Sequence, residues 1–452
     1  MLKNIKIAYI IGVGGISMSA IARFLHAEGI EVLGSDITIN DEIEKLLKDN
    51  IIKFKLKASK EFVKSCDIVI FSSAISENNS DILYAKKLGK PIFSRAEILG
   101  QLTQNKKTIS IAGTHGKTTT TGLISSVLLS CGLNPNIHIG GVLKNTNSNV
   151  HISKSDLFVT EACEYKDSFL SFKNYISVVL NIKPDHLDYF KTIENEFSSF
   201  QKFVDNTAED GYVIVNNDDK LSQELNIKCN KITYAIENDA NVKAQHILIS
   251  KDGHISFDVF IKGSRQGRIK LSCLGLHNVY NALACCGVCY ALGVPFNKIQ
   301  KGVHSFKGIA RRFEILQKNK KRMIVHDYAH HPDEIKAILN LCRFLKYKKV
   351  VAIFQPHTYS RTRDLYPQFL SCFNAADEVW LLPIYPAREK PIKGVSSFAL
   401  AKDLSKNGVK SQYFNSFEKC EQAIINYKEK GVLFAILGAG DIVELAYCFK
   451  KA

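Results

Sequence analysis

The sequence of 452 residues contains no long hydrophobic run, no low-complexity segment and no internal repeat. A membrane-spanning helix needs about 20 consecutive apolar residues, so none is expected. The first residues, M-L-K-N-I-K-I-A-Y-I-I-G, are apolar enough to imitate a signal sequence, but they run into a glycine turn without a clear cleavage site. We therefore expect a cytoplasmic protein without membrane insertion.

The twelve cysteines show no regular spacing, which indicates a reducing compartment rather than a disulfide framework. Cys285, Cys286 and Cys289 lie close together, but inside an apolar helical stretch, so packed core thiols are expected there rather than metal ligands. The formal net charge is +16, yet no basic run is interleaved with aromatic residues. We expect no nucleic acid as a partner and attribute the charge to a lysine-rich surface with a few pockets for anions.

The most informative stretch is K-T-I-S-I-A-G-T-H-G-K-T-T-T-T-G, residues 107–122. It predicts a short strand over 108–112, a glycine turn over 113–116 and a helix that opens at Lys117. Such a turn presents backbone N–H groups and a helix N-terminus to one point, which is a phosphate cradle. Lys117 can reach the outer phosphates, and the Thr118 hydroxyl suits Mg²⁺. Ile111 stands where the usual motif has its first glycine, but the other parts follow in the required order, which favours the cradle over a threonine-capped helix start.

The N-terminal segment predicts a strand over 6–11, a glycine turn at Gly12–Gly15, a helix and a second strand that is followed by Asp36. This order is typical of the opening of a dinucleotide-binding fold, although Ser17 occupies the place of the third glycine. Three interpretations remain open at this point. The turn is a nicotinamide site of an oxidoreductase, a site for a nucleotide diphosphate, or a purely structural turn.

Polar residues follow two further strands of this segment. Ser72 and Ser73 end an apolar stretch, and Arg95 follows the next one. Polar groups at the carboxyl edge of a parallel sheet suit phosphate or sugar contacts, and an ordinary serine turn explains the serines equally well.

Downstream of the cradle, Glu161 ends a predicted strand, and Asp185 with His186 follow the next strand along the chain. Gly140 and Gly141 are expected to form a turn between the cradle helix and the strand that ends at Glu161. An acid at the end of a strand beside a phosphate loop can hold Mg²⁺, directly or through water. His186 is a candidate ligand because it lies beside a Pro-Asp loop at a strand end.

Two later features can be interpreted either as functional or as purely structural. His277 and Asn281 share a face of a predicted helix, where they either read the edge of an adenine or cap the helix start. Arg311 and Arg312 either clamp a phosphate at a domain junction or are surface charges.

In the last segment, the loops D-Y-A-H-H-P (327–332) and Q-P-H-T-Y-S-R-T-R (355–363) each follow an apolar strand. Zinc binding by His330, His331 and His357 is disfavoured, because no cysteine or carboxylate pattern completes the set. Strands and helices alternate throughout the chain, and at about 150 residues per domain its length suggests about three domains. We predict an α/β protein of three domains, each with a largely parallel sheet: Rossmann-like over 1–106, P-loop ATPase-like over 107–310 and Rossmann-like over 311–452.

Taken together, the motifs resemble those of the Mur ligases of bacterial cell-wall synthesis. The resemblance extends over nearly the whole chain and is carried, in order, by G-V-G-G-I-S-M-S-A, G-T-H-G-K-T-T-T, E-A-C-E-Y with S-F-L, N-I-K-P-D-H-L-D-Y-F, H-N-V-Y-N-A, R-R-F-E, D-Y-A-H-H-P, F-Q-P-H-T-Y-S-R-T and G-A-G-D. It is greatest with the branch that acts on UDP-N-acetylmuramate and L-alanine. It therefore implies a ligase with ATP and Mg²⁺ (or Mn²⁺) as cofactors, acting as a monomer or homodimer.

The resemblance also implies roles for particular residues. UDP-sugar contacts fall on Gly12, Gly14, Gly15, Asp36, Ser72, Ser73 and Arg95. ATP contacts fall on Gly113, Thr114, His115, Gly116, Lys117, Thr118, Thr119, His277, Asn281, Arg312 and Asp327. Metal ligands fall on Thr118, Glu161 and His186, and the catalytic groups are Lys117, His330, His357 and Arg361, the last three at the alanine end of the site.

The implied chemistry is phosphorylation of a carboxylate by ATP and attack of the L-alanine amine on the acyl phosphate. Either His330 or His357 would accept the amine proton, and Arg361 would hold the alanine carboxylate. The alternatives are a ligase that attaches a whole tripeptide to the same sugar nucleotide, an NAD-dependent oxidoreductase and a non-catalytic nucleotide sensor.

Overall fold

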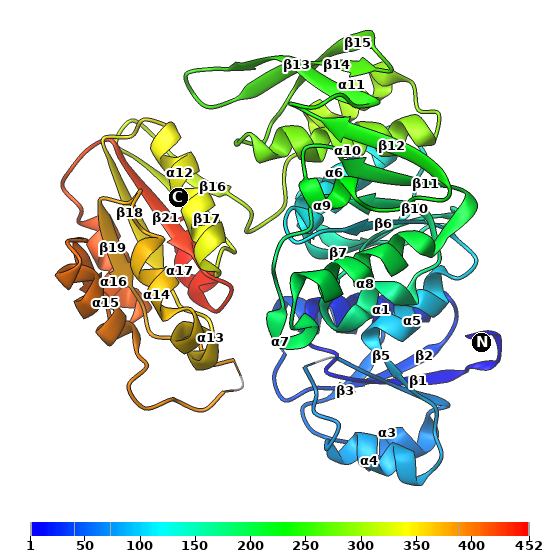
Figure 1. Cartoon of the computed structure of the whole chain (residues 1–452). Helices are drawn as coiled ribbons and strands as arrows, with labels where there is room; N and C mark the ends of the chain where they lie inside the picture. The colour runs from blue at the N-terminus through cyan, green and yellow to red at the C-terminus, as the bar shows by residue number, and fades with distance from the viewer. Residues whose placement is uncertain (1, 40, 73, 388, 451–452) are drawn as a thin grey trace. The chain divides into compact units, whose positions relative to one another are not determined.

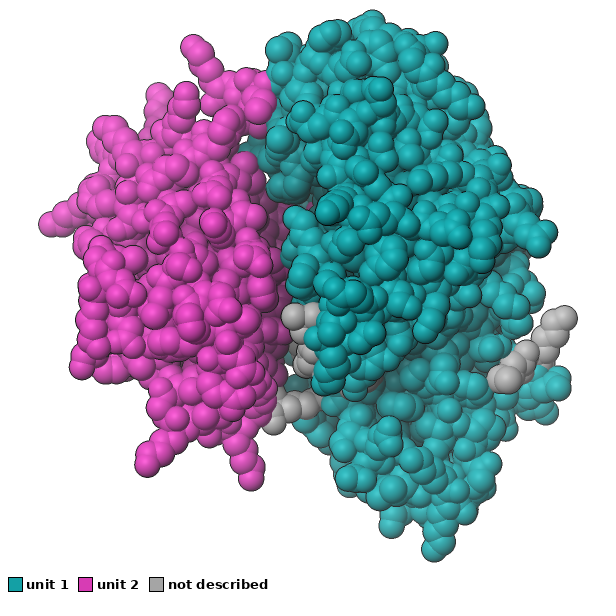
Figure 2. All heavy atoms as spheres, viewed as in Figure 1, with its two compact units in different colours: residues 1–248, 255–308 teal, residues 249–254, 309–452 magenta. Residues whose placement is uncertain are grey.

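The computed structural model describes residues 2–39, 41–72, 74–387 and 389–450. Its helices and strands are labelled in Figure 1. The chain forms two compact units, residues 1–248 with 255–308 and residues 249–254 with 309–452 (Figure 2). The strands of the described residues gather into sheets of five, ten and six members. Most neighbouring strands are parallel, which confirms the predicted α/β class with largely parallel sheets.

The first sheet has the order β3-β2-β1-β4-β5, and all its neighbours are parallel. Its strands are β1 (Ile7–Ile11), β2 (Glu31–Ser35), β3 (Lys53–Lys55), β4 (Ile68–Phe71) and β5 (Ile92–Ser94), after the short 3-10 helix η1 (Leu2–Asn4). The helices are α1 (Ile16–Ala27), α2 (Asp41–Asp49), α3 (Lys60–Ser65), α4 (Ser80–Lys87) and α5 (Arg95–Thr103). Alternate residues of β1 point to opposite faces, so Ala8 and Ile10 pack with α1, α2 and α5, whereas Tyr9 and Ile11 pack with α3 and α4.

The second sheet has the order β15-β14-β13-β12-β11-β10-β6-β9-β7-β8 and is antiparallel at β14–β15 and β7–β8. Its strands are β6 (Lys107–Ala112), β7 (Asn136–Leu143), β8 (Ser148–His151), β9 (Leu157–Glu161), β10 (Asn174–Val179), β11 (Thr207–Asn216), β12 (Asn230–Ala235), β13 (Val242–Ile249), β14 (Ile255–Ile261) and β15 (Ser264–Lys270). Its helices are α6 (Lys117–Ser130), the 3-10 segment η2 (Tyr165–Ser171), α7 (Leu187–Phe190), α8 (Ile193–Asp205), α9 (Lys220–Gln223), α10 (His277–Ala291) and α11 (Phe296–Ser305). The central strands β6 and β10 are buried on both faces, as parallel strands between helix layers are.

The prediction of a turn at Gly140–Gly141 was wrong, because both glycines lie inside β7. The pairing of β7 with β9 covers Asn136–His138, and beyond it the Gly140 N–H donates to the Glu161 carboxylate over 2.8 Å. A side chain at Gly140 would meet that carboxylate, with Cβ about 3.1 Å from its nearest oxygen. The glycine therefore permits the close approach of an acid, not a reversal of the chain.

The first two sheets of the first unit share a hydrophobic core. One contiguous cluster includes Ile10 of β1 and Leu25 of α1 together with Phe169 of η2 and Phe200 of α8. Polar contacts reinforce it. Ser17 Oγ lies 2.9 Å from His138 Nε2 of β7, and His138 Nδ1 lies 3.2 Å from Thr160 Oγ1 of β9. Burial, together with the charge of Arg95, lowers the pKa of His138 to about 3, so this link between the two sheets is uncharged.

The third sheet has the order β16-β17-β21-β18-β19-β20, antiparallel only at β16–β17 among the described pairs. Its strands are β16 (Glu314–Lys318), β17 (Arg322–Asp327), β18 (Lys349–Phe354), β19 (Glu378–Leu381), β20 (Ser411–Tyr413) and β21 (Val432–Leu437). The helices are α12 (Pro332–Phe344), α13 (Tyr359–Asp364), α14 (Tyr366–Ser371), α15 (Ser397–Lys406), α16 (Phe417–Ile425) and α17 (Ile442–Cys448). Helices α12, α14 and α15 pack on one face, and α16 and α17 pack on the other.

Candidate functional site

The phosphate loop, which is the predicted phosphate cradle of residues 113–116, joins β6 to α6. It contains two glycines at which any other residue type would strain the backbone. Gly113 has φ +136° and Gly116 has φ +90°, both in the region that favours glycine. A Cβ on Gly116 would lie 3.0 Å from Asn281 Oδ1, and one on Gly113 would lie 2.9 Å from Leu180 Cβ. The loop is therefore fixed by backbone conformation and by close packing against α10 and the residues that follow β10.

The loop is also tied by hydrogen bonds to the segment that follows β10. Thr114 N donates to Asn181 O over 3.1 Å, and His115 N donates to Asn181 Oδ1 over 2.9 Å. The Thr114 hydroxyl exchanges hydrogen bonds with the backbone of Lys183, as donor over 3.1 Å and as acceptor over 2.9 Å. The same segment carries Asp185 and His186, so the phosphate loop and the candidate metal ligands form one connected structure.

Lys117, at the first position of α6, bends back over the loop. Its Nζ donates to Gly113 O over 2.6 Å, to Thr114 O over 3.2 Å and to Glu164 Oε1 over 2.8 Å. Burial opposes the charge, but the Glu164 carboxylate and its neighbours outweigh burial, so the pKa of Lys117 is raised. Lys117 is therefore a cation at neutral pH, held over the loop where phosphate oxygens would lie.

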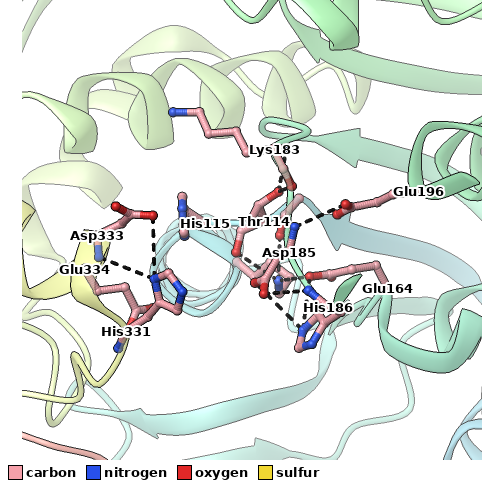
Figure 3. Close-up of polar contacts among 12 residues, drawn as sticks. Thr114, His115, Glu164, Lys183, Asp185, His186, Glu196, His331, Asp333 and Glu334 are labelled. Atoms are coloured by element: carbon pink, nitrogen blue, oxygen red, sulfur yellow. Dashed lines mark hydrogen bonds and ion pairs between the residues drawn. The ribbon is translucent and has the colours of Figure 1, made fainter. Parts of the chain in front are cut away.

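Glu164, Asp185 and His186 place one ligand atom each within 4.8 Å of one another (Figure 3). Glu164 has a fully buried side chain, and its Oε2 makes no hydrogen bond within the described residues. His186 has φ +51°, which is uncommon for a residue other than glycine and occurs at functional sites. The Tyr165 ring packs against the His186 ring at a centroid distance of 4.7 Å. Two carboxylates, one with an orphaned buried oxygen, fit a divalent cation such as Mg²⁺, and the imidazole is a ligand that Mn²⁺ tolerates better.

Two further acids, Glu196 and Asp167, form hydrogen bonds to the segments next to this cluster. Glu196 of α8 is buried and accepts a hydrogen bond from Asp185 N over 3.2 Å (Figure 3). Burial raises the pKa of Glu196 to about 7, and the neighbouring Glu164 and Asp185 carboxylates add to the rise. Asp167 accepts hydrogen bonds from the hydroxyls of Tyr189 and Ser199. Two acids thus fix the loop that bears Asp185 and His186 and the short helix that follows it.

The metal ligands predicted from the sequence occupy different positions around this cluster. His186 is one of its three members, Thr118 is buried in the first turn of α6, and Glu161 accepts the Gly140 N–H at the end of β9. Glu164 was not predicted from the sequence, and Asp185 was predicted only as a rim residue. The signal for Glu164 was a second acid three residues after Glu161, which the turn after β9 brings beside Lys117.

At the N-terminal glycine turn, the backbone donors of three residues are already used by the protein. Gly12 N and Val13 N donate to Ser35 O, and Gly14 N donates to Asp36 Oδ2 over 2.9 Å. Asp36 therefore anchors the turn through one oxygen, and its other oxygen accepts the Ile37 N–H.

Other residues predicted near this turn lie close to it. A Cβ on Gly12 would lie 3.3 Å from Ser72 Cβ, and Arg95 Nη1 donates to Ser17 Oγ over 3.3 Å. Gly15 precedes α1 as its N-cap. Ser73 lies outside the described residues.

His277 and Asn281 both belong to the first turns of α10, but their surroundings differ. His277 is exposed, with Nε2 3.2 Å from Asn278 Nδ2, whereas Asn281 is buried and donates to Asn278 Oδ1 over 2.9 Å. Asn281 also lies against Gly116 of the phosphate loop. The structure thus brings Asn281 to the cradle and leaves His277 at the protein surface.

In the second unit, Arg312 lies near the Tyr328 ring and acts electrostatically on Asp327. The guanidinium groups of Arg311 and Arg312 lie 4.8 Å and 5.4 Å from the centre of that ring. Asp327 ends β17 and accepts backbone hydrogen bonds from Phe313 over 2.6 Å and from Ala329 over 2.8 Å. Burial raises the pKa of Asp327 to about 6, although Arg312 and the two N–H groups oppose the rise.

The three residues predicted at the alanine end are brought together in the second unit. The rings of His330 and His357 lie 5.8 Å apart, and Arg361 Nη1 lies 3.2 Å from His357 Nδ1. His330 and His331 donate their backbone N–H groups to Glu334 of α12. His331 also caps that helix beside Asp333 (Figure 3). Glu334 was not predicted from the sequence. Within the ranges that the structure describes, the group with metal-ligand spacing is that of Glu164, Asp185 and His186, not these histidines.

Comparison with known proteins agrees with the fold along the whole chain. Residues 8–107 match the family model described as Mur ligase family, catalytic domain, residues 111–289 match the Mur ligase middle domain, and residues 311–440 match the Mur ligase, glutamate ligase domain. Among solved structures, UDP-N-acetylmuramate-alanine ligase from Thermotoga maritima is similar with a TM-score of 0.84 and 26% identity, covering 99% of each chain. A murein peptide ligase from Psychrobacter arcticus shares the fold, with a TM-score of 0.73 and 22% identity over 99% of this chain and 98% of that one.

Relatives of the same length share much of the sequence. The UDP-N-acetylmuramate–L-alanine ligase of Clostridium kluyveri is 40% identical over 447 residues, which are 98% of this chain and 97% of that protein. The ligase of the same name from Clostridium acetobutylicum is 41% identical over 451 residues, or 98% of this chain and 97% of that protein. The aligned residues span all three sheets and both units. They therefore include the phosphate loop, the cluster of Glu164, Asp185 and His186, and the histidines His330 and His357. On this ground the chain belongs to the Mur ligase family.

Proposed function

We propose that this protein is an ATP-dependent ligase that joins L-alanine to the lactyl carboxylate of UDP-N-acetylmuramate, with release of ADP and phosphate. The observation that carries the proposal is the phosphate loop, where Lys117 Nζ lies 2.8 Å from Glu164 Oε1, and Glu164 belongs with Asp185 and His186 to a group with metal-ligand spacing. That arrangement suits transfer of a phosphoryl group. The substrates are inferred from the names of the relatives of 40–41% identity. The reaction belongs to the synthesis of peptidoglycan precursors.

The proposed first step unites two anions, a carboxylate and a triphosphate. Lys117 binds the outer phosphate oxygens, and the backbone N–H groups of residues 113–119 hold the others. We assign a divalent cation, Mg²⁺ or Mn²⁺, to Glu164, Asp185 and His186, with Thr118 and Glu161 as further ligands, directly or through water. Such a cation, once bound, screens the charge on the phosphates. Arg312 of the second unit provides an additional positive charge, Asn281 and His277 contact the adenine, and Asp327 contacts the ribose.

The first sheet is the proposed site of the UDP-sugar. Its contacts are the first turn of α1, which follows Gly12–Gly15, and the side chains of Ser72 and Arg95. Ser17 stands at the place of the third glycine of a dinucleotide fingerprint, which favours a nucleotide-sugar over NAD. We assign residues 1–106 to this substrate, 107–310 to ATP and 311–452 to the amino acid.

In the proposed second step, the amine of L-alanine attacks the acyl phosphate and phosphate departs. Arg361 holds the alanine carboxylate and so orients the amine. Because water would hydrolyse the acyl phosphate, closure of the C-terminal domain over the site is part of the proposal. The twelve cysteines are unpaired, which suits the reducing cytoplasm, where these nucleotides occur. Within the described part of the chain, no helix combines the length and the apolar character that crossing a bilayer takes.

The test is a coupled assay of ADP release with ATP, Mg²⁺, UDP-N-acetylmuramate and L-alanine, from which each component is left out in turn. We expect ADP only when all four are present. A second arm replaces L-alanine by the tripeptide L-alanyl-γ-D-glutamyl-meso-diaminopimelate. Faster turnover with the tripeptide would assign the chain to the peptide-recycling branch instead, and tight binding of NADH would favour an oxidoreductase.

A further inference from the structure

His330 and His357, both of the second unit, differ in which ring nitrogen carries the proton. His330 Nδ1 lies 3.1 Å from Tyr328 O. A carbonyl oxygen only accepts hydrogen bonds, so Nδ1 must be the donor and must carry the hydrogen. Glu334 Oε2, a second acceptor, lies 3.5 Å from the same nitrogen. In the neutral ring the other nitrogen, Nε2, then has its lone pair unprotonated.

His357 shows the opposite arrangement. Its Nδ1 lies 3.2 Å from Arg361 Nη1. A guanidinium has donors but no acceptor and keeps its charge at all relevant pH values, so Nδ1 of His357 must accept. The proton of the neutral ring is therefore on Nε2. Burial and the nearby Arg361 lower the pKa of His357 to about 4, so the ring is neutral at pH 7.

The surrounding backbone fixes both rings. His330 N donates to Glu334 Oε2 over 3.1 Å, and α12 begins two residues later, at Pro332. His357 forms an isolated bridge with Tyr385, and Thr358 N donates to Tyr385 O over 2.8 Å. Each histidine is thus held in a segment that is anchored by backbone hydrogen bonds, which keeps its ring beside the partner that sets the tautomer.

From this difference we propose that His330 Nε2 accepts the proton of the attacking amine, and that His357 Nε2–H donates a hydrogen bond to an anionic oxygen of the substrates. The inference rests on the function proposed above and divides two roles that the sequence leaves interchangeable. Glu334 and the carbonyl of Tyr328 are positioning groups, because they act through His330.

The proton balance of the step is simple. The nitrogen of the neutral amine attacks the carbonyl carbon of the acyl phosphate, and the C–N bond forms. The bond between that carbon and the phosphate oxygen breaks, and inorganic phosphate leaves with the electron pair. The nitrogen loses one proton, which passes to His330 Nε2 and then to solvent. His357 cannot take this proton, because its Nε2 is already protonated and its Nδ1 faces Arg361.

The kinetic test compares His330→Gln with His357→Gln, using L-alanine and hydroxylamine as acceptors. Hydroxylamine is mostly unprotonated at neutral pH and traps acyl phosphates without a base, giving a hydroxamate. A glutamine amide can donate a hydrogen bond but cannot accept a proton. For His330→Gln we expect L-alanine turnover to fall at least about 100-fold, while hydroxamate formation stays within about threefold of the parent. For His357→Gln we expect the two acceptors to be affected alike, by about tenfold or less.

Several outcomes would overturn the inference. One is that His330→Gln keeps its turnover with L-alanine, and another is that it loses turnover with L-alanine and with hydroxylamine equally. The third is that His357→Gln loses turnover with L-alanine but not with hydroxylamine. Failure of the parent enzyme to form ADP with L-alanine would instead refute the proposed function.

A direct measurement does not depend on activity. In ¹⁵N-histidine-labelled protein, two-bond ¹⁵N–¹H correlation spectra distinguish the two neutral tautomers. The peaks lost in His330→Gln and His357→Gln assign the two rings. We expect the Nδ1–H tautomer for His330 and the Nε2–H tautomer for His357, and the same tautomer in both rings would refute the division of roles.

Discussion

At the scale of single residues, Lys117 combines a structural contribution with a proposed catalytic one. Its ammonium is the cationic partner of Glu164, whose side chain is fully buried, and it is also the proposed phosphate contact. Removing one member of a buried ion pair leaves an uncompensated charge in the interior. The two contributions can therefore be separated by removing the charge of Glu164 as well.

We predict that Lys117→Ala lowers turnover about 1000-fold or more and lowers the free energy of unfolding by about 3 kcal/mol. The double variant Lys117→Ala/Glu164→Gln should recover most of that stability, because no unpaired charge remains, and none of the activity. ADP release and chemical denaturation provide the two measurements. Recovery of turnover by the double variant would contradict the phosphate role of Lys117.

At the scale of elements, the entry into α6 depends on the backbone of Gly116. The residue has φ +90° and leaves no room for a side chain beside Asn281. Gly132, after the end of the same helix, has φ +81°, but a Cβ there would meet nothing within 4 Å. The two glycines therefore differ in packing and not in backbone strain.

We predict that Gly116→Ala weakens binding of a non-hydrolysable ATP analogue at least tenfold and lowers stability by about 1–2 kcal/mol. Gly132→Ala is the matched control and should cost about 1 kcal/mol of stability with nucleotide affinity unchanged. Calorimetric titration and denaturation curves measure the two effects. Equal affinities of both variants for the analogue would contradict the assignment of the loop.

The third sheet contains an acid whose ionisation stabilises it. Glu378 of β19 accepts hydrogen bonds from Lys410 over 2.7 Å, from Tyr427 over 2.9 Å and from Trp380 over 3.2 Å, and Lys349 lies 3.0 Å away. Burial alone would raise the pKa of Glu378, but these donors outweigh it and lower the pKa to about 2.

Because the folded pKa is below that of the unfolded chain, ionised Glu378 stabilises the fold above about pH 4.5, and the contribution is lost as the pH falls toward 2. We predict that Glu378→Gln costs about 2 kcal/mol of stability at pH 7 and that the difference from the parent shrinks by about half at pH 3. Urea denaturation at pH 7, 4.5 and 3 measures this. A difference that is constant or grows on acidification would contradict the shift.

These elements also show what could be predicted from the sequence. The strand over 108–112, the helix from Lys117 and the helix over 277–291 were predictable, because hydrophobic patterning and glycine position are local properties. Cys285, Cys286 and Cys289 are buried core thiols, as their apolar surroundings predicted. Gly140 was misjudged because its close approach to Glu161 is made across two strands.

Glu164 and Glu334 were missed for the same reason as each other. Each acts through a neighbour that a turn brings close, Lys117 in one case and the backbone of His330 in the other. The tautomers of His330 and His357 depend on single hydrogen bonds to a carbonyl and a guanidinium, which no spacing in a sequence reports.

At the scale of the whole molecule, a formal charge of +16 would attract the two proposed nucleotide substrates before they bind. Both are anions, whereas L-alanine is a zwitterion without net charge. A positive field raises the rate of encounter with anions and is screened when salt shortens the Debye length from about 10 Å at 0.1 M to about 4 Å at 0.5 M.

We predict that raising the ionic strength from about 0.05 M to 0.5 M lowers kcat/KM for ATP and for the UDP-sugar several-fold and leaves kcat/KM for L-alanine within a factor of about two. Initial rates at fixed saturating levels of the other two substrates measure each value, and L-alanine is the internal control. An equal decline for all three substrates would indicate a general salt effect on the enzyme rather than electrostatic attraction.

The first two sheets share a core and are linked by hydrogen bonds among Ser17, His138 and Thr160. This connection has a consequence for inhibitor design. The proposed subsites for both nucleotides belong to one compact unit, so a bisubstrate compound that tethers a uridine diphosphate mimic to a triphosphate mimic would need a single linker length. A compound that also mimics the amino acid would need groups for the proposed contacts of the second unit as well.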